Sequence, residues 1–459
     1  MIELPFLASH TVAVMGLGRS GMASAEALSR SGATVWAWDD DGARREEAAA
    51  RGIPVVDLAS ADLAVPAMLL WSPGIPHTHP RPHPVAMRAR AAGRPIICDV
   101  ELLARAQPKA TYVAVTGTNG KSTTTALIAH ILRTTGRRAE AGANLGTPAL
   151  ALAPLVRGGV YVLELSSYQL ELIDTARFDV SVLLNVTPDH LGRHGGMDGY
   201  LAAKRRILDH AKASGTIVIG FDDGPCRSLF SGFAGAVPIS AQAELERGVY
   251  APEGLLIDHR RPAPQVVLDL RPIPTLPGRH NWQNAAAAYA AACAVGCDPR
   301  AVCDAIASYP GLPHRQELVA TIGGIAYVND SKATNADAAE KALVCYDRIY
   351  WIAGGLPKEG GIEALRPHFG RIAHAFLIGQ AADEFAGTLD GAVPHTQCGD
   401  LATAVARAHA MAQAEGGKGA VVLLSPACAS WDQFASFEAR GDAFRAAVEK
   451  LRTGREARP

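Results

Sequence analysis

Tyr112–Thr125 reads YVAVTGTNGKSTTT and predicts a strand, a glycine-rich loop and the start of a helix. The backbone amides of such a loop and the N-terminus of the following helix suit phosphate oxygens. Lys121 would reach the β- and γ-phosphates of a nucleotide, and the Ser122 hydroxyl would contact Mg²⁺. Val115 stands where the strict GxxxxGK[ST] pattern has its first glycine, while the Gly-Lys-Ser core is intact. The stretch therefore predicts binding of a nucleoside triphosphate.

Similar strand-like apolar runs recur on both sides of this stretch, each followed by a turn and a helical pattern. They lie at Thr11–Leu17, Thr34–Asp39, Val160–Leu165, Val180–Val186, Ile325–Asp330, Tyr350–Ala353 and Val421–Ser425. Alternating strands and helices predict an α/β fold with largely parallel sheets. Because ligands of open α/β sheets bind at the carboxyl ends of the strands, the polar motifs that follow these strands are expected to converge on shared clefts.

The length of 459 residues suggests about three domains. One boundary is expected near Asp99–Lys109, after a first α/β unit. Another is expected near Tyr309–Leu312, where proline and glycine interrupt a helical region. Residues 240–277 are rich in proline and short alternating strands, and they are interpreted as an excursion within the middle domain. We therefore predict three domains, comprising residues 1–100, 101–311 and 312–459.

A second glycine-rich loop lies near the N-terminus. Gly16–Gly21 (GLGRSG) follows one predicted strand and opens a helix, and Asp39 ends the next strand. In such a dinucleotide-binding turn the glycines allow close approach of phosphates, and the acid meets a ribose. The loop indicates a nucleotide diphosphate. For the part of the chain up to Asp99 alone, a nicotinamide-dependent dehydrogenase is the first interpretation.

The composition is typical of a soluble globular protein, with 48% hydrophobic and 19% charged residues. A net charge of -1, from 44 basic and 45 acidic residues, disfavours a nucleic-acid or acidic-membrane partner. The cysteines form no CxxC pair, which disfavours a zinc ribbon or a thioredoxin-like site. The sequence contains neither a signal peptide nor an apolar run long enough to span a membrane. A cytoplasmic protein is expected.

Several motifs resemble those of the Mur ligase family, which includes folylpolyglutamate synthases. Thr116–Thr125 is similar to the ATP loop of that family. Further matching segments are ELSSYQL at Glu164–Leu170, NVTPDH at Asn185–His190, YLAAK at Tyr200–Lys204, HNWQN at His280–Asn284 and GLPHR at Gly311–Arg315. Two segments look like those of the member that adds D-glutamate, namely DSKATN at Asp330–Asn335 and SPACASWDQF at Ser425–Phe434. The resemblance runs from about Thr11 to about Arg445.

The resemblance implies a Rossmann-like N-terminal domain that binds UDP, a central P-loop ATPase-type domain with a parallel sheet, and a Rossmann-like C-terminal domain. It also implies a reaction. ATP would phosphorylate the alanyl carboxylate of UDP-N-acetylmuramoyl-L-alanine, and the amine of D-glutamate would attack the acyl phosphate, in cytoplasmic peptidoglycan precursor synthesis. The expected partners are these small molecules, with no nucleic acid, no membrane and a monomeric chain.

The resemblance also assigns the residues that handle ATP and metal. The catalytic residues would be Lys121, Glu164, His190 and Lys204. The ATP-binding residues would be Gly117, Thr118, Asn119, Gly120, Lys121, Ser122, Thr123, Asn281, Asn284, Arg315, Asp330 and Lys332. Mg²⁺, at two sites, would be bound by Ser122, Glu164, His190 and Lys204, the last as a carbamate formed with CO₂. An ammonium group would repel Mg²⁺, whereas a carbamate offers anionic oxygens. Considered alone, His190, which is expected to end a strand, suggests a structural role, and Lys204 suggests a solvated helix lysine.

Two further sets of residues are assigned by the same resemblance. The UDP-linked substrate would be held by Gly18, Arg19, Ser20, Asp39, Ser72, Asn144, Ser166 and Gln169. The amino acid would be held by Thr334, Lys358, Ser430 and the backbone of Phe437. The acidic run at residues 39–41 is unusual beside an expected diphosphate.

Three alternatives remain at this stage. The first is another ligase of the same family, which adds L-alanine or a diamino acid, and the two C-terminal motifs disfavour it. The second is a nicotinamide-dependent oxidoreductase, which would leave the Lys121 loop and Glu164–Leu170 without a role. The third is a nucleotide-binding module without catalysis, which the presence of a candidate group for every step disfavours.

Overall fold

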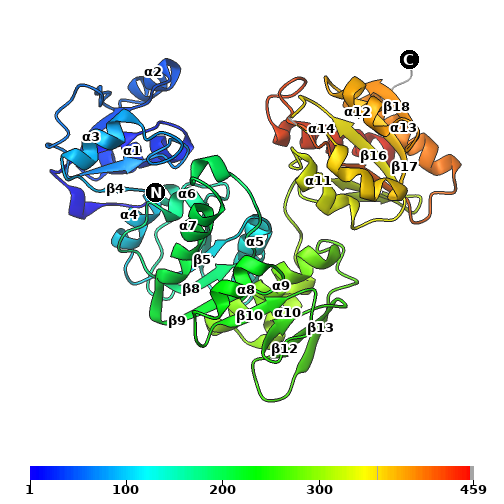
Figure 1. Cartoon of the computed structure of the whole chain (residues 1–459), viewed down its shortest axis with the longest axis horizontal. Coiled ribbons are helices and arrows are strands. Elements are labelled where there is room, and N and C mark those ends of the chain that lie inside the picture. Colours follow the sequence, from blue (N-terminus) through cyan, green and yellow to red (C-terminus); the bar gives the residue numbers. More distant parts are fainter. Residues whose placement is uncertain (359, 455–459) are drawn as a thin grey trace. The chain divides into compact units, whose positions relative to one another are not determined.

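The computed structural model describes residues 1–358 and 360–454. It contains three β-sheets (Figure 1) and divides into two compact units. One unit comprises Met1–Leu270 and Asn281–Tyr309, and the other comprises Arg271–His280 and Pro310–Pro459. The predicted α/β fold with largely parallel sheets is confirmed, and the domain limits at residues 100 and 311 stay predictions.

The first sheet has four parallel strands in the order β2-β1-β3-β4. Its strands are β1 (Thr11–Met15), β2 (Thr34–Trp38), β3 (Met68–Trp71) and β4 (Ile96–Ile97). The helices of this part are η1 (Pro5–Leu7), α1 (Arg19–Arg30), α2 (Gly42–Ala50), α3 (Pro84–Ala91) and α4 (Asp99–Ala106). The central strands β1 and β3 are almost entirely buried because helices cover the sheet, which is why they are continuous apolar runs.

The second sheet has nine strands in the order β13-β12-β11-β10-β9-β8-β5-β7-β6. Its strands are β5 (Thr111–Thr116), β6 (Ala139–Ala143), β7 (Val160–Glu164), β8 (Phe178–Leu183), β9 (Ala211–Gly220), β10 (Val237–Ser240), β11 (Gly248–Tyr250), β12 (Leu255–His259) and β13 (Gln265–Asp269). The strands from β6 across to β11 pair in parallel, and β12 and β13 are antiparallel. The segment interpreted as an excursion therefore supplies the edge strands β11 to β13 of the middle sheet, while residues 271–277 belong to the other compact unit.

Most helices of the middle region lie between its parallel strands along the chain, and α9 and α10 follow the last strand, β13. The helices of this region are α5 (Lys121–Thr134), η2 (Ala149–Ala151), α6 (Ser167–Leu170), η3 (Leu191–Arg193), α7 (Met197–Asp209), α8 (Gly224–Phe230), α9 (Gly278–Ala294) and α10 (Pro299–Ala307). One hydrophobic core runs from Ile2 to Ala236 and is shared by the first two sheets. The amide of Ile2 also donates to the carbonyl of Leu150 at 2.8 Å. The first two sheets are therefore packed as one body.

The third sheet has six strands in the order β14-β15-β19-β16-β17-β18, and only the edge strand β14 is antiparallel. Its strands are β14 (Glu317–Ile322), β15 (Ile325–Asn329), β16 (Ile349–Gly354), β17 (Ile372–Ile378), β18 (His395–Gly399) and β19 (Val421–Leu424). Its helices are α11 (Ala336–Leu343), η4 (Glu363–Arg371), α12 (Ala382–Leu389), α13 (Leu401–Ala414) and α14 (Phe437–Arg452). Trp351 faces one hydrophobic core and Tyr350 faces another, so helices cover both faces of the sheet.

The order of the middle sheet positions the predicted phosphate loop. Strands β5 and β7 are neighbours, and Val115 pairs with Glu164. The loop that follows β5 and the acid that ends β7 therefore meet at the carboxyl edge of the sheet, where open α/β sheets bind ligands. Among the described helices, none has both the length and the apolar character needed to cross a membrane.

Candidate functional site

The predicted phosphate loop forms a tight turn before helix α5. Gly120 is the N-cap of that helix and has a left-handed φ of 83°, a conformation that favours glycine. The ammonium of Lys121 curls back over the loop and donates to the carbonyls of Gly117 at 3.0 Å and Thr118 at 2.8 Å. The helix N-terminus and this cation lie together, which is the arrangement that suits a phosphate.

Asn185 holds the loop from the end of the neighbouring strand. Its Oδ1 accepts from the amide of Asn119 at 2.8 Å, and its Nδ2 donates to the carbonyl of Asn119 at 3.1 Å. Thr118 is held in the same way, because its hydroxyl donates to the carbonyl of Thr187 at 3.0 Å. No role for Asn185 was predicted from the sequence. The only available signal was its place at the start of NVTPDH, directly after a strand.

Glu164 fits the predicted metal role. Its side chain is 3% exposed, and Oε1 accepts from Asn144 Nδ2 at 2.6 Å. The other oxygen, Oε2, is buried and has no hydrogen-bond partner among the described residues. An unpaired buried carboxylate oxygen is costly, so a hard cation at this position would satisfy it. No three His, Cys, Asp or Glu side chains cluster as a ready-made metal site within residues 1–358 and 360–454, so water, phosphate and hydroxyl oxygens would complete the shell.

Lys204 reaches the same loop from helix α7. Lys204 is 1% exposed. Its amino group donates to the carbonyl of Gly117 at 2.8 Å and lies 4.8 Å from the centre of the Tyr200 ring. Burial, reinforced by the positive charge of Lys121, lowers the pKa of Lys204 well below its ordinary value. The solvated helix lysine that the local sequence suggests is therefore wrong. Tyr200, whose hydroxyl lies 3.1 Å from the Thr118 hydroxyl, is a further contact that the sequence analysis missed.

His190 lies in a loop and does not end a strand, contrary to the sequence prediction. Strand β8 ends at Leu183, and His190 caps η3 with a left-handed φ of 52°. The imidazole is 56% exposed, and its Nε2 lies 3.4 Å from the Asp189 carboxylate. Partial burial and the ammonium groups of Lys121 and Lys204 lower its pKa. A lowered pKa favours the neutral imidazole, which can accept a metal ion.

The two asparagines predicted to contact ATP open helix α9 and face the phosphate loop. Asn284 accepts from the Thr124 hydroxyl at 3.2 Å, and its Nδ2 donates to Asn281 Oδ1 at 3.2 Å. A Cβ atom on Gly120 would lie 2.2 Å from Asn284 Oδ1. Asn284 therefore packs directly against the loop, which explains the glycine at position 120.

The residues predicted for the UDP-linked substrate fall into two groups within the same compact unit. The first surrounds the glycine-rich loop after β1. Asp39 Oδ2 accepts from the Leu17 amide at 2.6 Å, and Oδ1 accepts from the Asp41 amide at 2.9 Å. Burial would raise the pKa of Asp39, but these two hydrogen bonds and Arg44 lower it. Asp39 therefore holds the loop in shape. Gly18, Arg19 and Ser20 begin helix α1 from that loop.

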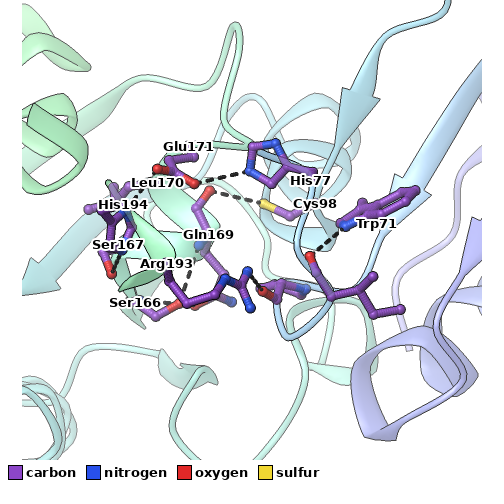
Figure 2. Close-up of polar contacts among 12 residues, drawn as sticks. Trp71, His77, Cys98, Ser166, Ser167, Gln169, Leu170, Glu171, Arg193 and His194 are labelled. Carbon is purple, nitrogen blue, oxygen red and sulfur yellow. Dashed lines mark hydrogen bonds and ion pairs between the residues drawn. The ribbon is translucent and has the colours of Figure 1, made fainter. Parts of the chain in front are cut away.

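The second group lies on and beside helix α6. Ser166 and Gln169 form a capping box, in which the Ser166 hydroxyl accepts from the Gln169 amide and Gln169 Oε1 accepts from the Ser166 amide (Figure 2). Asn144 donates to Glu164, which lies two residues before Ser166 in the chain. Ser72 follows β3, and a Cβ atom on Gly16 would lie 2.4 Å from Ser72 Cβ. The loop that follows β3, which contains Ser72 and His77 and is called the Ser72 loop, is therefore packed on the glycine-rich loop.

The remaining predicted residues belong to the other compact unit. Asp330 is buried, and its Oδ2 accepts from the Ser425 hydroxyl at 2.8 Å. Burial raises the pKa of Asp330 to about 7, against the lowering effect of Ser425, Gln316 and the charge of Arg315. Lys332 lies over the ring of Phe437 at 5.1 Å. Lys332 therefore lies at the start of helix α14, and Asp330 is hydrogen-bonded to Ser425, directly after β19.

Arg440 organises the two loops predicted to bind the amino acid, and the sequence analysis missed it. The residue is 1% exposed, and its guanidinium donates to the carbonyls of Ser331 at 2.9 Å and Cys428 at 3.0 Å. It thus joins DSKATN to SPACAS. No signal in the sequence separates it from other helix arginines. Thr334 is half-buried, Ser430 is buried, and Lys358 is exposed in the loop after β16.

Comparisons with known proteins place the chain in a family. A family model described as the Mur ligase middle domain matches residues 115–292. A protein of Paramagnetospirillum magneticum is 58% identical over 99% of both chains. One of Rhodospirillum rubrum is 54% identical over 100% of this chain and 98% of its own. The chain therefore belongs to the Mur ligase family. Both relatives are named UDP-N-acetylmuramoylalanine--D-glutamate ligase.

A solved structure supports the fold independently. The MurF ligase of Thermotoga maritima, in complex with ADP, matches with a TM-score of 0.59 at 19% sequence identity and covers 99% of this chain and 98% of its own. Agreement over nearly the whole of both chains supports the observed succession of three sheets.

Proposed function

We propose that the chain is an ATP-dependent ligase that joins D-glutamate to UDP-N-acetylmuramoyl-L-alanine through an acyl phosphate, in peptidoglycan precursor synthesis. The observation that carries the proposal is the meeting of Lys121, Glu164 and Lys204 around one phosphate-type loop at the edge of the middle sheet. A simple dinucleotide-dependent oxidoreductase requires no such site. The names of the full-length relatives support the particular amino acid.

The groups on the chain have separate tasks in this reaction. The loop amides, the start of helix α5 and Lys121 would hold the ATP phosphates and balance charge that develops on the transferring oxygens. Asn185 and Asn284 would keep the loop in that shape without moving during the reaction. Exclusion of water would protect the acyl phosphate until the amine attacks.

Mg²⁺ would be held by Ser122, Glu164 and His190, with a carbamate on Lys204 as a further anionic ligand. The Glu164 oxygen that lacks a hydrogen-bond partner among the described residues supports this assignment. The lowered pKa of Lys204 favours the neutral amine that CO₂ requires. When bound, the cation would supply charge neutralisation between the phosphate oxygens and the substrate carboxylate. The buried Lys204 position would otherwise place a second cation beside Lys121.

D-glutamate brings two carboxylates and one amine. The proposed contacts are Thr334 and Lys358 for one carboxylate, and Ser430 with the first amide of helix α14, at Phe437, for the other. A helix N-terminus favours an anion, and Arg440 fixes the loops that carry Thr334 and Ser430. The remaining proposed contacts are Gly18, Arg19, Ser20, Asp39, Ser72, Asn144, Ser166 and Gln169 for the UDP-linked substrate, and Asn281, Arg315, Asp330 and Lys332 for ATP.

The test is an assay of ATP-dependent phosphate release with UDP-N-acetylmuramoyl-L-alanine. D-glutamate, L-glutamate, L-alanine and meso-diaminopimelate are compared side by side. D-glutamate is expected to give the highest kcat/KM, with formation of one amide product. A preference for another amino acid would overturn the proposed specificity, and binding of NAD without phosphate release would overturn the ligase assignment. The proposal includes a monomeric cytoplasmic enzyme, which gel filtration and cell fractionation would test.

A further inference from the structure

A cluster of charged and polar side chains ties the Ser72 loop to helix α6, between the two groups of proposed substrate residues. At its centre is Glu171, directly after α6. The two Glu171 oxygens contact His77 Nε2 at 3.0 Å and His194 Nδ1 at 2.8 Å (Figure 2). His77 lies in the loop that follows β3, and His194 lies just after η3. Three separate segments therefore meet at one carboxylate.

The protonation of the two histidines follows from their partners. Arg90 donates to His77 Nδ1 at 3.0 Å, so Nδ1 is the acceptor and Nε2 carries the proton that is donated to Glu171. Burial would raise the pKa of Glu171, but the hydrogen bonds from His194 and His77 lower it to about 2. The ionised carboxylate can only accept, so His194 Nδ1 is also a donor. Both contacts are thus charge-assisted and stronger than neutral hydrogen bonds.

The side chain of Arg193 binds the backbone of the same loop. Its guanidinium donates to the carbonyl of Gly74 at 2.8 Å and to that of Pro73 at 3.3 Å, and it lies over the ring of Tyr168 at 4.5 Å. Pro73 and Gly74 directly follow Ser72. The Ser72 loop is therefore fixed at two points, at its backbone by Arg193 and at His77 by Glu171.

The connection Ser167–His194–Glu171 has the order of a serine–histidine–acid triad, with His194 Nε2 2.9 Å from the Ser167 hydroxyl. Its surroundings exclude a nucleophilic role. The His194 side chain is 0% exposed and packs between the rings of Tyr168 at 5.3 Å and Tyr200 at 5.4 Å. The arrangement therefore serves to lock η3 onto α6.

We infer that Glu171, Arg193 and His194 are positioning residues that set the separation between the Ser72 loop and helix α6, and thereby the fit of the UDP-linked substrate between them. The inference rests on the proposed function, because the substrate must reach from the glycine-rich loop to Glu164. The Ser72 loop is packed on Gly16 at one side, and Ser166 and Gln169 are part of α6 at the other. Asn185 and Thr187 hold the ATP loop. Tyr200, which packs on His194, also contacts Thr118 of that loop, so Glu171 and Arg193 are the residues whose effect on the UDP-linked substrate can be separated from an effect on ATP.

The first test measures KM for each substrate in Glu171→Gln and Arg193→Met. Loss of a charge-assisted contact should raise KM for UDP-N-acetylmuramoyl-L-alanine roughly tenfold, and KM for ATP and D-glutamate should change by less than about twofold. The matched control is Asp209→Asn, which removes an exposed carboxylate on α7 that pairs with Arg205 at 3.4 Å. All its kinetic constants should equal those of the wild type. Equal rises in all three KM values, or a lower melting temperature with unchanged kinetics, would overturn the inference.

The second test uses a conservative replacement of His77 and a direct binding measurement. Gln offers a donor near the position of His77 Nε2, so His77→Gln should recover most of the affinity that His77→Ala loses. The Kd for UDP-N-acetylmuramoyl-L-alanine, measured by calorimetry without ATP, separates the two proposals. A wild-type chain that binds this molecule but forms no amide would refute the proposed function, while weaker binding by Glu171→Gln and Arg193→Met would still support the positioning role. A wild-type chain that does not bind it would refute both.

Discussion

Lys121 and Lys204 direct their amino groups to one acceptor, the carbonyl oxygen of Gly117, at 3.0 and 2.8 Å. Two ammonium groups so close repel each other, and burial penalises the charge of Lys204 further. The pKa of Lys204 is accordingly well below its ordinary value. This relationship joins two requirements of the proposed reaction, a cation for the phosphates and a neutral amine that can take up CO₂.

Lys204→Ala should lose most of the ligase activity, because it removes the proposed carbamate. A short carboxylic acid in the buffer should restore part of the activity by occupying the vacated position, and the measurement is phosphate release with and without acetate. The control is Lys212→Ala, whose partly exposed ammonium pairs with Asp179 at 2.8 Å, and which acetate should not affect. An unmodified Lys204 amine, seen at high resolution in active enzyme supplied with CO₂, would refute the carbamate.

Lys121→Ala should abolish phosphate release while the protein stays folded, because the Lys121 ammonium donates to carbonyls of the loop itself and is proposed to bind phosphate. Circular dichroism and the melting temperature check folding, and the steady-state assay checks turnover. Turnover close to that of the wild type would remove Lys121 from the catalytic residues.

Gly120→Ala should raise KM for ATP at least roughly tenfold, because a clash worth about 1.4 kcal/mol corresponds to that factor. The new Cβ would lie 2.2 Å from Asn284 Oδ1 and would displace the side chain that packs on the loop. Gly136→Ala is the matched control at the other end of α5. Its φ of 81° is equally left-handed, but nothing lies within 4 Å of its Cβ. It should destabilise by about 1 kcal/mol and leave KM for ATP unchanged. A similar KM effect in both variants would show that backbone strain, rather than the contact with Asn284, is responsible.

Glu101→Gln should lower the free energy of unfolding by about 2–3 kcal/mol near neutral pH. Glu101 accepts from the amides of Asp174, Thr175 and Ala176 at 3.0 to 3.1 Å. Burial would raise the pKa of Glu101, but these bonds and the Thr175 hydroxyl lower it to about 2 from an ordinary 4.5. The carboxylate therefore stabilises the fold above about pH 4.5, and this contribution is lost as the pH falls toward 2.

Urea unfolding of the wild type and of Glu101→Gln as a function of pH would test the direction of this pH dependence. The difference between the two should shrink on acidification. The exposed Glu47, which pairs with Arg51 at 2.6 Å, provides the control, because Glu47→Gln should change the free energy of unfolding by less than about 0.5 kcal/mol. If the difference in the free energy of unfolding between the wild type and Glu101→Gln grew at low pH, the stabilising role of the Glu101 carboxylate would be contradicted.

Lys358→Ala should raise KM for D-glutamate roughly ten- to a hundredfold, since a charge-assisted contact is worth about 1.5–3 kcal/mol. KM for ATP should not change, because Lys358 is proposed to meet a carboxylate of the amino acid only. Lys450→Ala, at the exposed end of α14, is the control. An unchanged KM for D-glutamate would leave Lys358 as an exposed loop residue without a binding role.

Local sequence patterns were enough to predict the strands that precede the main motifs and the loops that follow those strands. The run before Gly117 is a buried parallel strand, and the glycine at position 120 has the left-handed φ that the loop requires. Such features depend on the residues themselves and on their near neighbours in the chain. His190 was misplaced because the apolar run before it resembled a longer strand, whereas β8 ends at Leu183.

The sequence by itself determined the α/β fold, the glycine turns and the positions of the motifs along the chain. Only the tertiary structure decided which distant groups meet. Lys204 lies 87 positions from the carbonyl that it contacts, and Glu171 lies 94 positions from His77. Such pairs depend on the order β8-β5-β7 in the middle sheet and on the packing of two sheets around one core. A side chain's burial and pKa are set by those distant neighbours, so no local pattern can distinguish Lys204 from a solvated lysine, or Glu171 from an exposed acid at the end of a helix.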